Sequence, residues 1–137
     1  MTAETWVTYS DGASRGNPGP ASYGALVIDP GGEVVHEASE PLGVTTNNIA
    51  EYRGLIAALE AALALGARRV EARMDSELLV RQAIGRYRVK NRGLIPLHNR
   101  VLNLRGQFDE VVFKHVPRAQ NKQADALANQ ALDRGPS

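Results

Sequence analysis

Runs of apolar residues with a period of about two, bounded by turn residues, predict five strands. They cover 5–10, 23–29, 33–39, 69–74 and 110–116. Residues 29–32 (DPGG) predict a tight turn that joins the second and third strands as an antiparallel hairpin. Residues 12–24 contain four glycines and two prolines and are predicted to form a loop.

Four other segments have apolar residues three or four positions apart, which is typical of helices. The longest runs to Gly66, with Asn48 and Glu51 spaced as a capping box that places Glu51 in its first turn. Further helices are predicted over 77–85, from about Leu94, and from about Asn121. A basic connection (YRVKNRG, 87–93) separates the two middle helices.

The resulting order, β-β-β-α-β-α-α-β-α, indicates one α/β domain over residues 1–134, followed by a short tail or linker stub at 135–137. The first three strands follow one another closely and should be antiparallel, whereas the last two are reached through helices and should be parallel. We therefore expect a mixed five-stranded sheet with helices on both faces. Strands 5–10 and 69–74 should be neighbours.

Composition narrows the possible chemistry. The 137 residues include no cysteine, which excludes disulfides, thiol nucleophiles and cysteine-ligated zinc. No apolar run has the length of a membrane span, and the first residues lack the basic start of a signal peptide. We therefore expect a cytoplasmic protein without membrane contact. We also expect a monomer.

The net charge of +1 hides an uneven distribution. Residues 78–108 contain no acid but seven arginines and lysines, including Arg86, Arg88 and Lys90. Such a stretch favours a polyanionic partner, although a solvated helix face with a loop would have the same composition.

Four carboxylates lie where predicted elements begin or end: Asp11, Glu51, Asp75 and Asp125. Each has an ordinary structural explanation, as a turn former, a cap or an acid in a first helical turn. These explanations do not account for the convergence of all four at one edge of the sheet, where clustered carboxylates repel one another unless a cation joins them. Oxygen-only ligands favour Mg²⁺ or Mn²⁺, and two such ions can clamp a phosphodiester.

The sequence resembles ribonuclease HI over nearly its whole length. The resemblance rests on four segments in the family's order and spacing: YSDGASRGNPGPASYG (9–24), TTNNIAEYRGLIAALEAAL (45–63), MDSELLV (74–80) and HVPRAQNKQADALAN (115–129). It is closer to the short type, because the long basic, Trp-rich protrusion of some members is absent.

The resemblance implies a two-metal endoribonuclease that hydrolyses the RNA strand of RNA–DNA hybrids and leaves 5′-phosphate and 3′-hydroxyl ends. Asp11, Glu51, Asp75 and Asp125 match the family's catalytic metal ligands. Two Mg²⁺ ions, or Mn²⁺ as a substitute, would bind once substrate is present. His115 matches a mobile histidine that assists proton movement or product departure.

We predict substrate contacts, from this resemblance and from the basic stretch, at Gly12, Ser14, Asn17, Thr46, Asn47, Asn48, Arg86, Arg88, Lys90 and Asn121. Amide groups at such positions can read 2′-hydroxyls in a shallow minor groove, and capping or turn formation is the structural alternative. Two other functions stay open: cleavage of double-stranded RNA or RNA–DNA junctions, and hybrid binding without cleavage. Related domains occur in fusions, so a further domain after residue 137 is also open.

Overall fold

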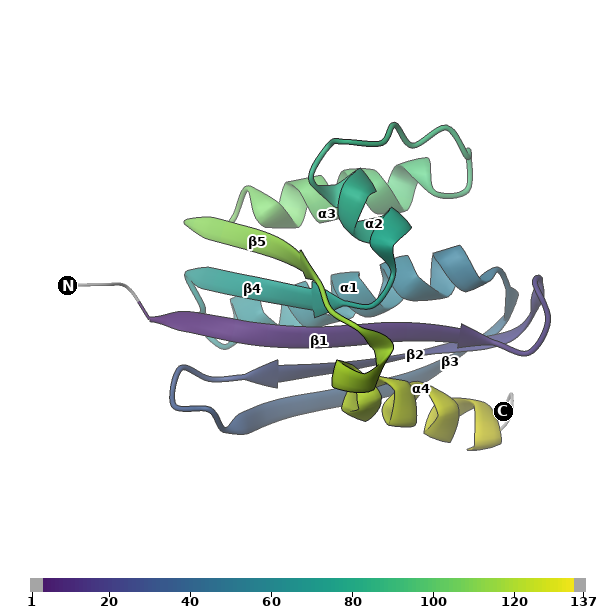
Figure 1. Ribbon diagram of the computed structural model, residues 1–137, viewed down its shortest axis with the longest axis horizontal. Coiled ribbons are helices and arrows are strands. Elements are labelled where there is room, and N and C mark those ends of the chain that lie inside the picture. The colour runs from purple at the N-terminus through teal and green to yellow at the C-terminus, as the bar shows by residue number, and fades with distance from the viewer. Residues whose placement is uncertain (1–3, 135–137) are drawn as a thin grey trace.

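The computed structural model describes residues 4–134, and the predicted tail at 135–137 lies outside them. Five strands form one sheet in the order β3-β2-β1-β4-β5 (Figure 1). Their bounds are Thr5–Ser14 for β1, Gly19–Ile28 for β2, Val34–Thr45 for β3, Arg69–Met74 for β4 and Glu110–His115 for β5. β1, β2 and β3 pair antiparallel, while β4 runs parallel to both β1 and β5. The predicted mixed sheet, with β1 beside β4, is confirmed.

Helices cover both faces of this sheet. α1 (Asn47–Ala64) lies behind β1 and β2 in Figure 1, and α4 (Lys122–Arg134) lies in front. α2 (Glu77–Ala83) and α3 (Ile95–Arg105) lie on the side of α1, and a 3₁₀ turn at Arg118–Gln120 leads into α4. Within residues 4–134, none of the helices has the length and apolar character that crossing a membrane requires.

The prediction of a loop over residues 12–24 is wrong. β1 continues to Ser14 and β2 begins at Gly19, so only residues 15–18 connect the two strands. Their ladder runs from Val7 opposite Ile28 to Ser14 opposite Ala21. Glycine usually marks loops, but inside a sheet it also permits close approach of another backbone. β3 is likewise longer than predicted and ends at Thr45.

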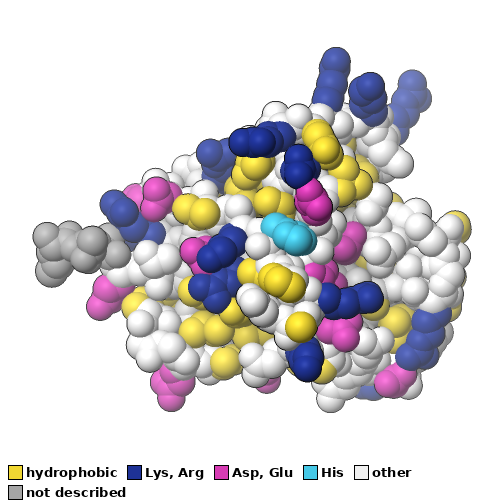
Figure 2. Space-filling model, viewed as in Figure 1, with side chains coloured by type: hydrophobic (Ala, Val, Ile, Leu, Met, Phe, Trp, Pro, Cys, Tyr) yellow, Lys and Arg dark blue, Asp and Glu magenta, His cyan; other side chains and the backbone are white. Residues whose placement is uncertain are grey.

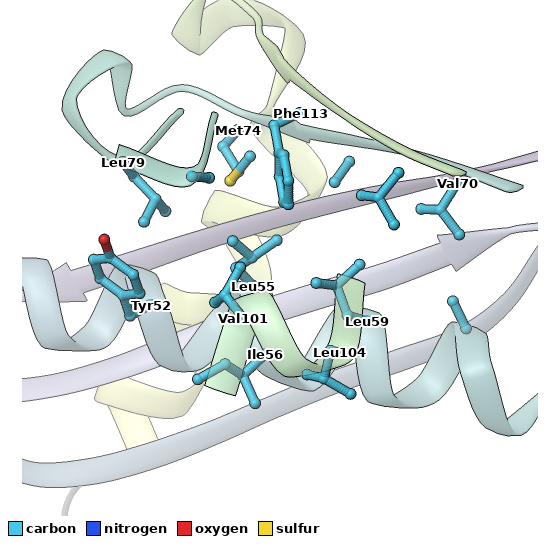
Figure 3. Close-up of a cluster of buried hydrophobic side chains, with 14 of the residues drawn as sticks. Tyr52, Leu55, Ile56, Leu59, Val70, Met74, Leu79, Val101, Leu104 and Phe113 are labelled. Carbon is cyan, nitrogen blue, oxygen red and sulfur yellow. The ribbon is translucent and has the colours of Figure 1, made fainter. Parts of the chain in front are cut away.

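The main hydrophobic core lies between the sheet and the layer of α1 and α3 (Figure 3). Leu55 and Leu59 of α1 are fully buried there, as is Val101 of α3. The predicted period of three and four along α1 therefore corresponds to its buried face. The other labelled core residues are Tyr52, Ile56, Val70, Met74, Leu79, Leu104 and Phe113.

One polar interaction inside this core fixes α2 against α1. The Tyr52 hydroxyl donates a buried hydrogen bond of 2.6 Å to Gln82 Oε1. His98 of α3 packs edge-on to the Tyr52 ring, and its Nε2 lies 3.1 Å from the Gln82 carbonyl oxygen. α2 begins two residues after Asp75, so this network also restrains the segment that carries Asp75.

Candidate active site

Gly12 allows α1 to lie directly against β1. A Cβ atom on Gly12 would lie 2.3 Å from the Glu51 nitrogen and 2.5 Å from the Ala50 carbonyl carbon. Real Cβ atoms do not approach backbone this closely, so only glycine fits. The contact places the Glu51 backbone beside the strand that carries Asp11.

Gly24 has the same role on the opposite face of the sheet. A Cβ atom there would lie 2.3 Å from the Ala124 carbonyl oxygen, so the backbone of α4 rests on β2. Asp125, the next residue of α4, occupies the first turn of that helix. Two hydroxyls hold the helix in place, because Ser22 donates to the Ala128 carbonyl and Ser39 donates to the Leu127 carbonyl.

Three carboxylates meet at the end of the parallel strand pair. Met74, the last residue of β4, pairs with Ser10 of β1, so Asp75 lies just past the end of β4 beside Asp11, which is still within β1. Oxygen atoms of Asp11, Glu51 and Asp75 all lie within 4.8 Å of one another. Asp125 lines the same pocket and is hydrogen-bonded to Asp11. These four residues are called the acidic cluster below.

The helix caps near the cluster differ from the predicted ones. Thr46 caps α1, and its Oγ1 accepts a hydrogen bond of 3.2 Å from Ile49 N, so the predicted Asn48–Glu51 capping box is wrong. Glu51 is the fifth residue of α1 and lies beyond its first turn. Ser76, rather than Asp75, caps α2. Neither the Glu51 nor the Asp75 carboxylate therefore serves as a helix cap.

Crowding and burial raise the pKa of two members of the cluster. The Asp11 side chain is 7% exposed. Burial first, and then the charge of Asp75 and the hydrogen bond with Asp125, raise the pKa of Asp11 to about 8. Burial and the charge of Asp75 raise the pKa of Glu51 to about 7, although a hydrogen bond from Ser76 and the charge of Arg118 oppose the rise.

The cluster offers the oxygen ligands that a hard divalent cation requires. Asp75 Oδ2 is buried and has no hydrogen-bond partner within residues 4–134, which is costly for a carboxylate oxygen unless a cation is bound. The hydrogen bond between Asp11 and Asp125 needs a proton that a cation would replace. With only carboxylate oxygens available, the set suits Mg²⁺ or Mn²⁺ rather than zinc.

A pocket of about 490 Å³ opens above the cluster. Gly12, Ser14 and Asn47, all predicted as substrate contacts, line it. Sequence reasoning missed three other lining residues, Ala13, Arg118 and Asn129. Arg118 could have been found, because it is a basic residue inside the segment that joins His115 to Asp125.

The remaining predicted contacts on this side surround the start of α1. Asn17 Oδ1 accepts a hydrogen bond of 3.1 Å from Asn47 N, which ties the β1–β2 turn to the helix. The Asn47 side chain reaches Glu51 Oε1 at 3.5 Å. Thr46 is the cap, and Asn48 is exposed on the first turn.

His115 and the basic residues lie outside the carboxylate pocket. His115 is exposed at the end of β5, and with Glu77 and Arg86 it lines a neighbouring pocket. Arg86, Arg88 and Lys90 are exposed on the connection between α2 and α3. Basic side chains project from that part of the molecule in Figure 2.

Asn121 differs from the prediction of a substrate contact. It is 1% exposed, and its Nδ2 donates a hydrogen bond of 2.9 Å to the Ser10 carbonyl oxygen. A side chain enclosed in this way presents no face to a substrate, so we correct its assignment to an internal role.

Comparison with known proteins places this fold and site in a family. A family model described as reverse transcriptase-like matches residues 9–131. The chain is 47% identical to ribonuclease HI of Halobacterium salinarum, over 91% of this chain and 63% of the relative. It is 33% identical to ribonuclease H of Thiobacillus denitrificans, over 96% of each. It is also 48% identical to the bifunctional protein Rv2228c of Mycobacterium tuberculosis, of which it spans 35%.

Solved structures agree with these relatives. The N-terminal RNase H domain of Rv2228c superposes with a TM-score of 0.93 at 46% identity, covering 96% of both chains. LC11-RNase H1, solved in complex with an RNA/DNA hybrid, superposes with a TM-score of 0.89 at 42% identity, covering 96% of this chain and 99% of that one. The sheet order, the acidic cluster and these likenesses together show that the chain belongs to the ribonuclease H family.

Proposed function

We propose that this protein is a divalent-cation-dependent endoribonuclease that hydrolyses the RNA strand of RNA–DNA hybrids and leaves 5′-phosphate and 3′-hydroxyl ends. The observation that carries the proposal is the convergence of four carboxylates from β1, α1, the end of β4 and α4 on one open pocket. Relatives named ribonuclease H and the hybrid-bound LC11-RNase H1 support the choice of substrate.

Asp11, Glu51 and Asp75 would hold Mg²⁺, or Mn²⁺ in its place, and Asp125 would complete the set when substrate binds. Two bound ions would supply Lewis-acid activation of the attacking water and stabilisation of the leaving 3′ oxygen. Burial, and then the neighbouring charges of Asp75, Asp125 and Glu51, raise the pKa of Asp11, so Asp11 interacts with every other carboxylate of the cluster. Asp11 would therefore help to hold any cation that the cluster binds.

The protein residues around the cluster would select RNA. Ser14 and Asn47 line the pocket beside the carboxylates, at positions where a hydroxyl and an amide can contact a 2′-hydroxyl. Asn17, Thr46 and Asn48 extend this surface past the start of α1. His115, exposed beyond the end of β5, would help to move protons or release product.

The basic connection would bind the backbone of the duplex. Arg86, Arg88 and Lys90 are exposed cations on a connection between helices, so their contacts would be with phosphates of the duplex. Affinity should then depend on salt and little on base sequence.

The test is cleavage of an end-labelled RNA–DNA hybrid with Mg²⁺ or Mn²⁺, compared with EDTA. Asp11→Asn should keep the fold and lower the rate by roughly 10³-fold or more, as expected for loss of a preorganised electrostatic group. Asp133→Asn is the matched control, because Asp133 is an exposed α4 carboxylate paired with Arg15 away from the cluster.

Assays with other nucleic acids distinguish cleavage of hybrids from the alternative functions. Duplex RNA, duplex DNA and a duplex with an RNA–DNA junction are assayed in parallel, since groove shape and 2′-hydroxyls distinguish them. Cutting confined to the hybrid supports the proposal. If duplex RNA or the junction is cut faster than the hybrid, the proposed substrate is wrong. If the protein binds the hybrid but does not cut it with any metal, the proposed cleavage activity is wrong.

A further inference from the structure

Asn121 connects the two chain segments that carry Asp11 and Asp125. It follows the 3₁₀ turn at Arg118–Gln120 and directly precedes α4. Its Nδ2 donates a buried hydrogen bond of 2.9 Å to the carbonyl oxygen of Ser10, the residue before Asp11. The side chain is 1% exposed.

The backbone of Asn121 holds two more residues of the pocket. Its N–H donates to the Arg118 carbonyl oxygen at 2.9 Å, and its own carbonyl oxygen accepts from the Asp125 nitrogen at 3.1 Å. Arg118, Asp125 and Asp11 all line the carboxylate pocket. One residue therefore sets the position of the α4 start, and of the turn before it, relative to β1.

The chemistry of this position requires a neutral donor. The only side-chain bond that Asn121 makes within residues 4–134 is the one to Ser10, because its buried Oδ1 has no partner. An aspartate would lose the donor and add a buried negative charge close to the acidic cluster. An aliphatic residue would leave the Ser10 carbonyl oxygen without this donor.

We propose that Asn121 is a positioning residue, which holds Asp125 and Arg118 at their working distance from Asp11 and does not touch the substrate. The proposal rests on the proposed cleavage activity and deepens it. If it is correct, Asn121 controls the rate of the bound complex and the demand for divalent cation, and leaves hybrid affinity unchanged.

A purely structural tether is the competing explanation, and the chain offers a matched control for it. Ser22 is also fully buried, and its hydroxyl also ties α4 to the sheet by donating to the Ala128 carbonyl. This second tether lies one helical turn further along α4 than Asp125. Ser22→Ala therefore loosens the same helix without acting at the cluster.

The experiment compares Asn121→Ala with Ser22→Ala at a temperature where both are fully folded. We expect Asn121→Ala to lower kcat by about 10- to 100-fold, as for loss of an outer support of a metal site, and to raise the Mg²⁺ concentration for half-maximal rate. KM for the hybrid should stay within about twofold of the wild-type value. Ser22→Ala should leave kcat and the Mg²⁺ requirement nearly unchanged, even if its melting temperature falls as far as that of Asn121→Ala.

Amide hydrogen exchange without metal gives a readout that is independent of activity. Exchange at Asp125 N should be faster in Asn121→Ala and unchanged in Ser22→Ala. If the wild type cuts no substrate, the proposed function fails, and this exchange measurement still decides whether Asn121 positions Asp125.

Two results would overturn the inference. A rise in KM with unchanged kcat would make Asn121 a substrate contact, and equal losses in the two variants would make it a simple tether. If Asn121→Ala does not fold, Asn121→Ser keeps a donor on a shorter side chain and should show the same split between kcat and KM in a weaker form.

Discussion

Asp11 of β1 lies directly opposite Gly24 of β2 in the antiparallel ladder. Because Gly24 has no side chain, the backbone of α4 rests on the sheet beside Asp11. The same helix supplies Asp125, which interacts with Asp11. The glycine therefore lets the helix bring Asp125 next to the central carboxylate.

The close approach of α1 at Gly12 gives the first prediction. Gly12→Ala would force a Cβ atom against the backbone of Ala50 and Glu51, so α1 must move outward. We expect a loss of about 1–3 kcal/mol in the free energy of unfolding. Cleavage should fall further than the folded fraction, because Glu51 moves away from Asp11. Urea denaturation and the hybrid assay measure the two effects.

Gly106→Ala is the control for that substitution. Gly106 ends α3 with an ordinary φ of −67°, and the nearest atom to an added Cβ would be 3.5 Å away. This variant should keep both stability and activity. Equal behaviour of the two alanine variants would contradict the proposed role of Gly12.

The raised pKa values predict how the metal-free protein responds to pH. Asp11 and Glu51 have pKa values of about 8 and 7 in the folded state, compared with roughly 4 when unfolded. The folded state then binds more protons, so the stability from these groups is complete below about pH 4 and is lost as pH rises towards 8. In EDTA, the melting temperature should fall between pH 5 and 8.5, and less steeply in Asp11→Asn. Parallel curves for the two proteins would contradict the assignment.

Metal binding to the substrate-free protein should depend more on Asp75 than on Asp125. Asp75 belongs to the three carboxylates whose oxygens lie within 4.8 Å of one another, and its Oδ2 has no hydrogen-bond partner among the described residues. Asp75→Asn should weaken Mn²⁺ binding without substrate by about 10-fold or more, whereas Asp125→Asn should leave it within a few-fold. Calorimetric titration measures both. Both variants should lose most cleavage, and equal losses of Mn²⁺ affinity would contradict this division.

Arg118 should influence how strongly protons compete with divalent cations for the Glu51 carboxylate. Its positive charge lowers the pKa of Glu51, so Arg118→Ala should raise that pKa above its present value of about 7. Arg118 repels a divalent cation as well as a proton, so its loss should strengthen Mn²⁺ binding at pH 9, where few protons compete, by about 1 kcal/mol, or roughly fivefold. The gain should be smaller near pH 6.5, because the cation must then displace a more tightly held proton. Arg105→Ala, at the exposed end of α3, should show no such pH dependence.

The basic connection should account for part of the salt dependence of hybrid binding. Arg88→Ala should reduce the slope of log affinity against log salt by about 1 if Arg88 contacts a phosphate. Arg68 is also an exposed arginine; it precedes β4, at the strand end opposite Asp75, and it pairs with Asp109. Arg68→Ala should leave the slope unchanged. Identical slopes in the two variants would remove Arg88 from the interface.

The sequence predicts the sheet well because its strands and helices have distinct apolar periods. The neighbourhood of β1 and β4 followed from element order alone, and so did the convergence of Asp11 with Asp75. The glycines at 12, 19 and 24 misled the loop prediction because glycine has two uses. Gly12 and Gly24 contact helices whose residues lie far away in the sequence, and no local pattern records these contacts, whereas Gly19 packs against its own turn at Arg15 and Gly16.

Burial also could not be predicted from local pattern. Asn121 is polar and lies in a segment shared with a nuclease family, so a surface contact was a reasonable expectation. Its enclosure depends on Ser10, more than 100 residues earlier in the chain. The position of Arg118 between His115 and Asp125 could have marked it as a site residue, but its effect on Glu51 arises only when α1 and the 3₁₀ turn meet.

The last strand–helix connection also has a consequence for synthesis on the ribosome. Asp11, Glu51 and Asp75 are made early, but α4, which carries Asp125, is the last element of residues 4–134 to emerge. A nascent chain that has folded only as far as β5 still lacks this carboxylate. Under the proposed function, cleavage of hybrids should therefore begin only after α4 has docked on the sheet.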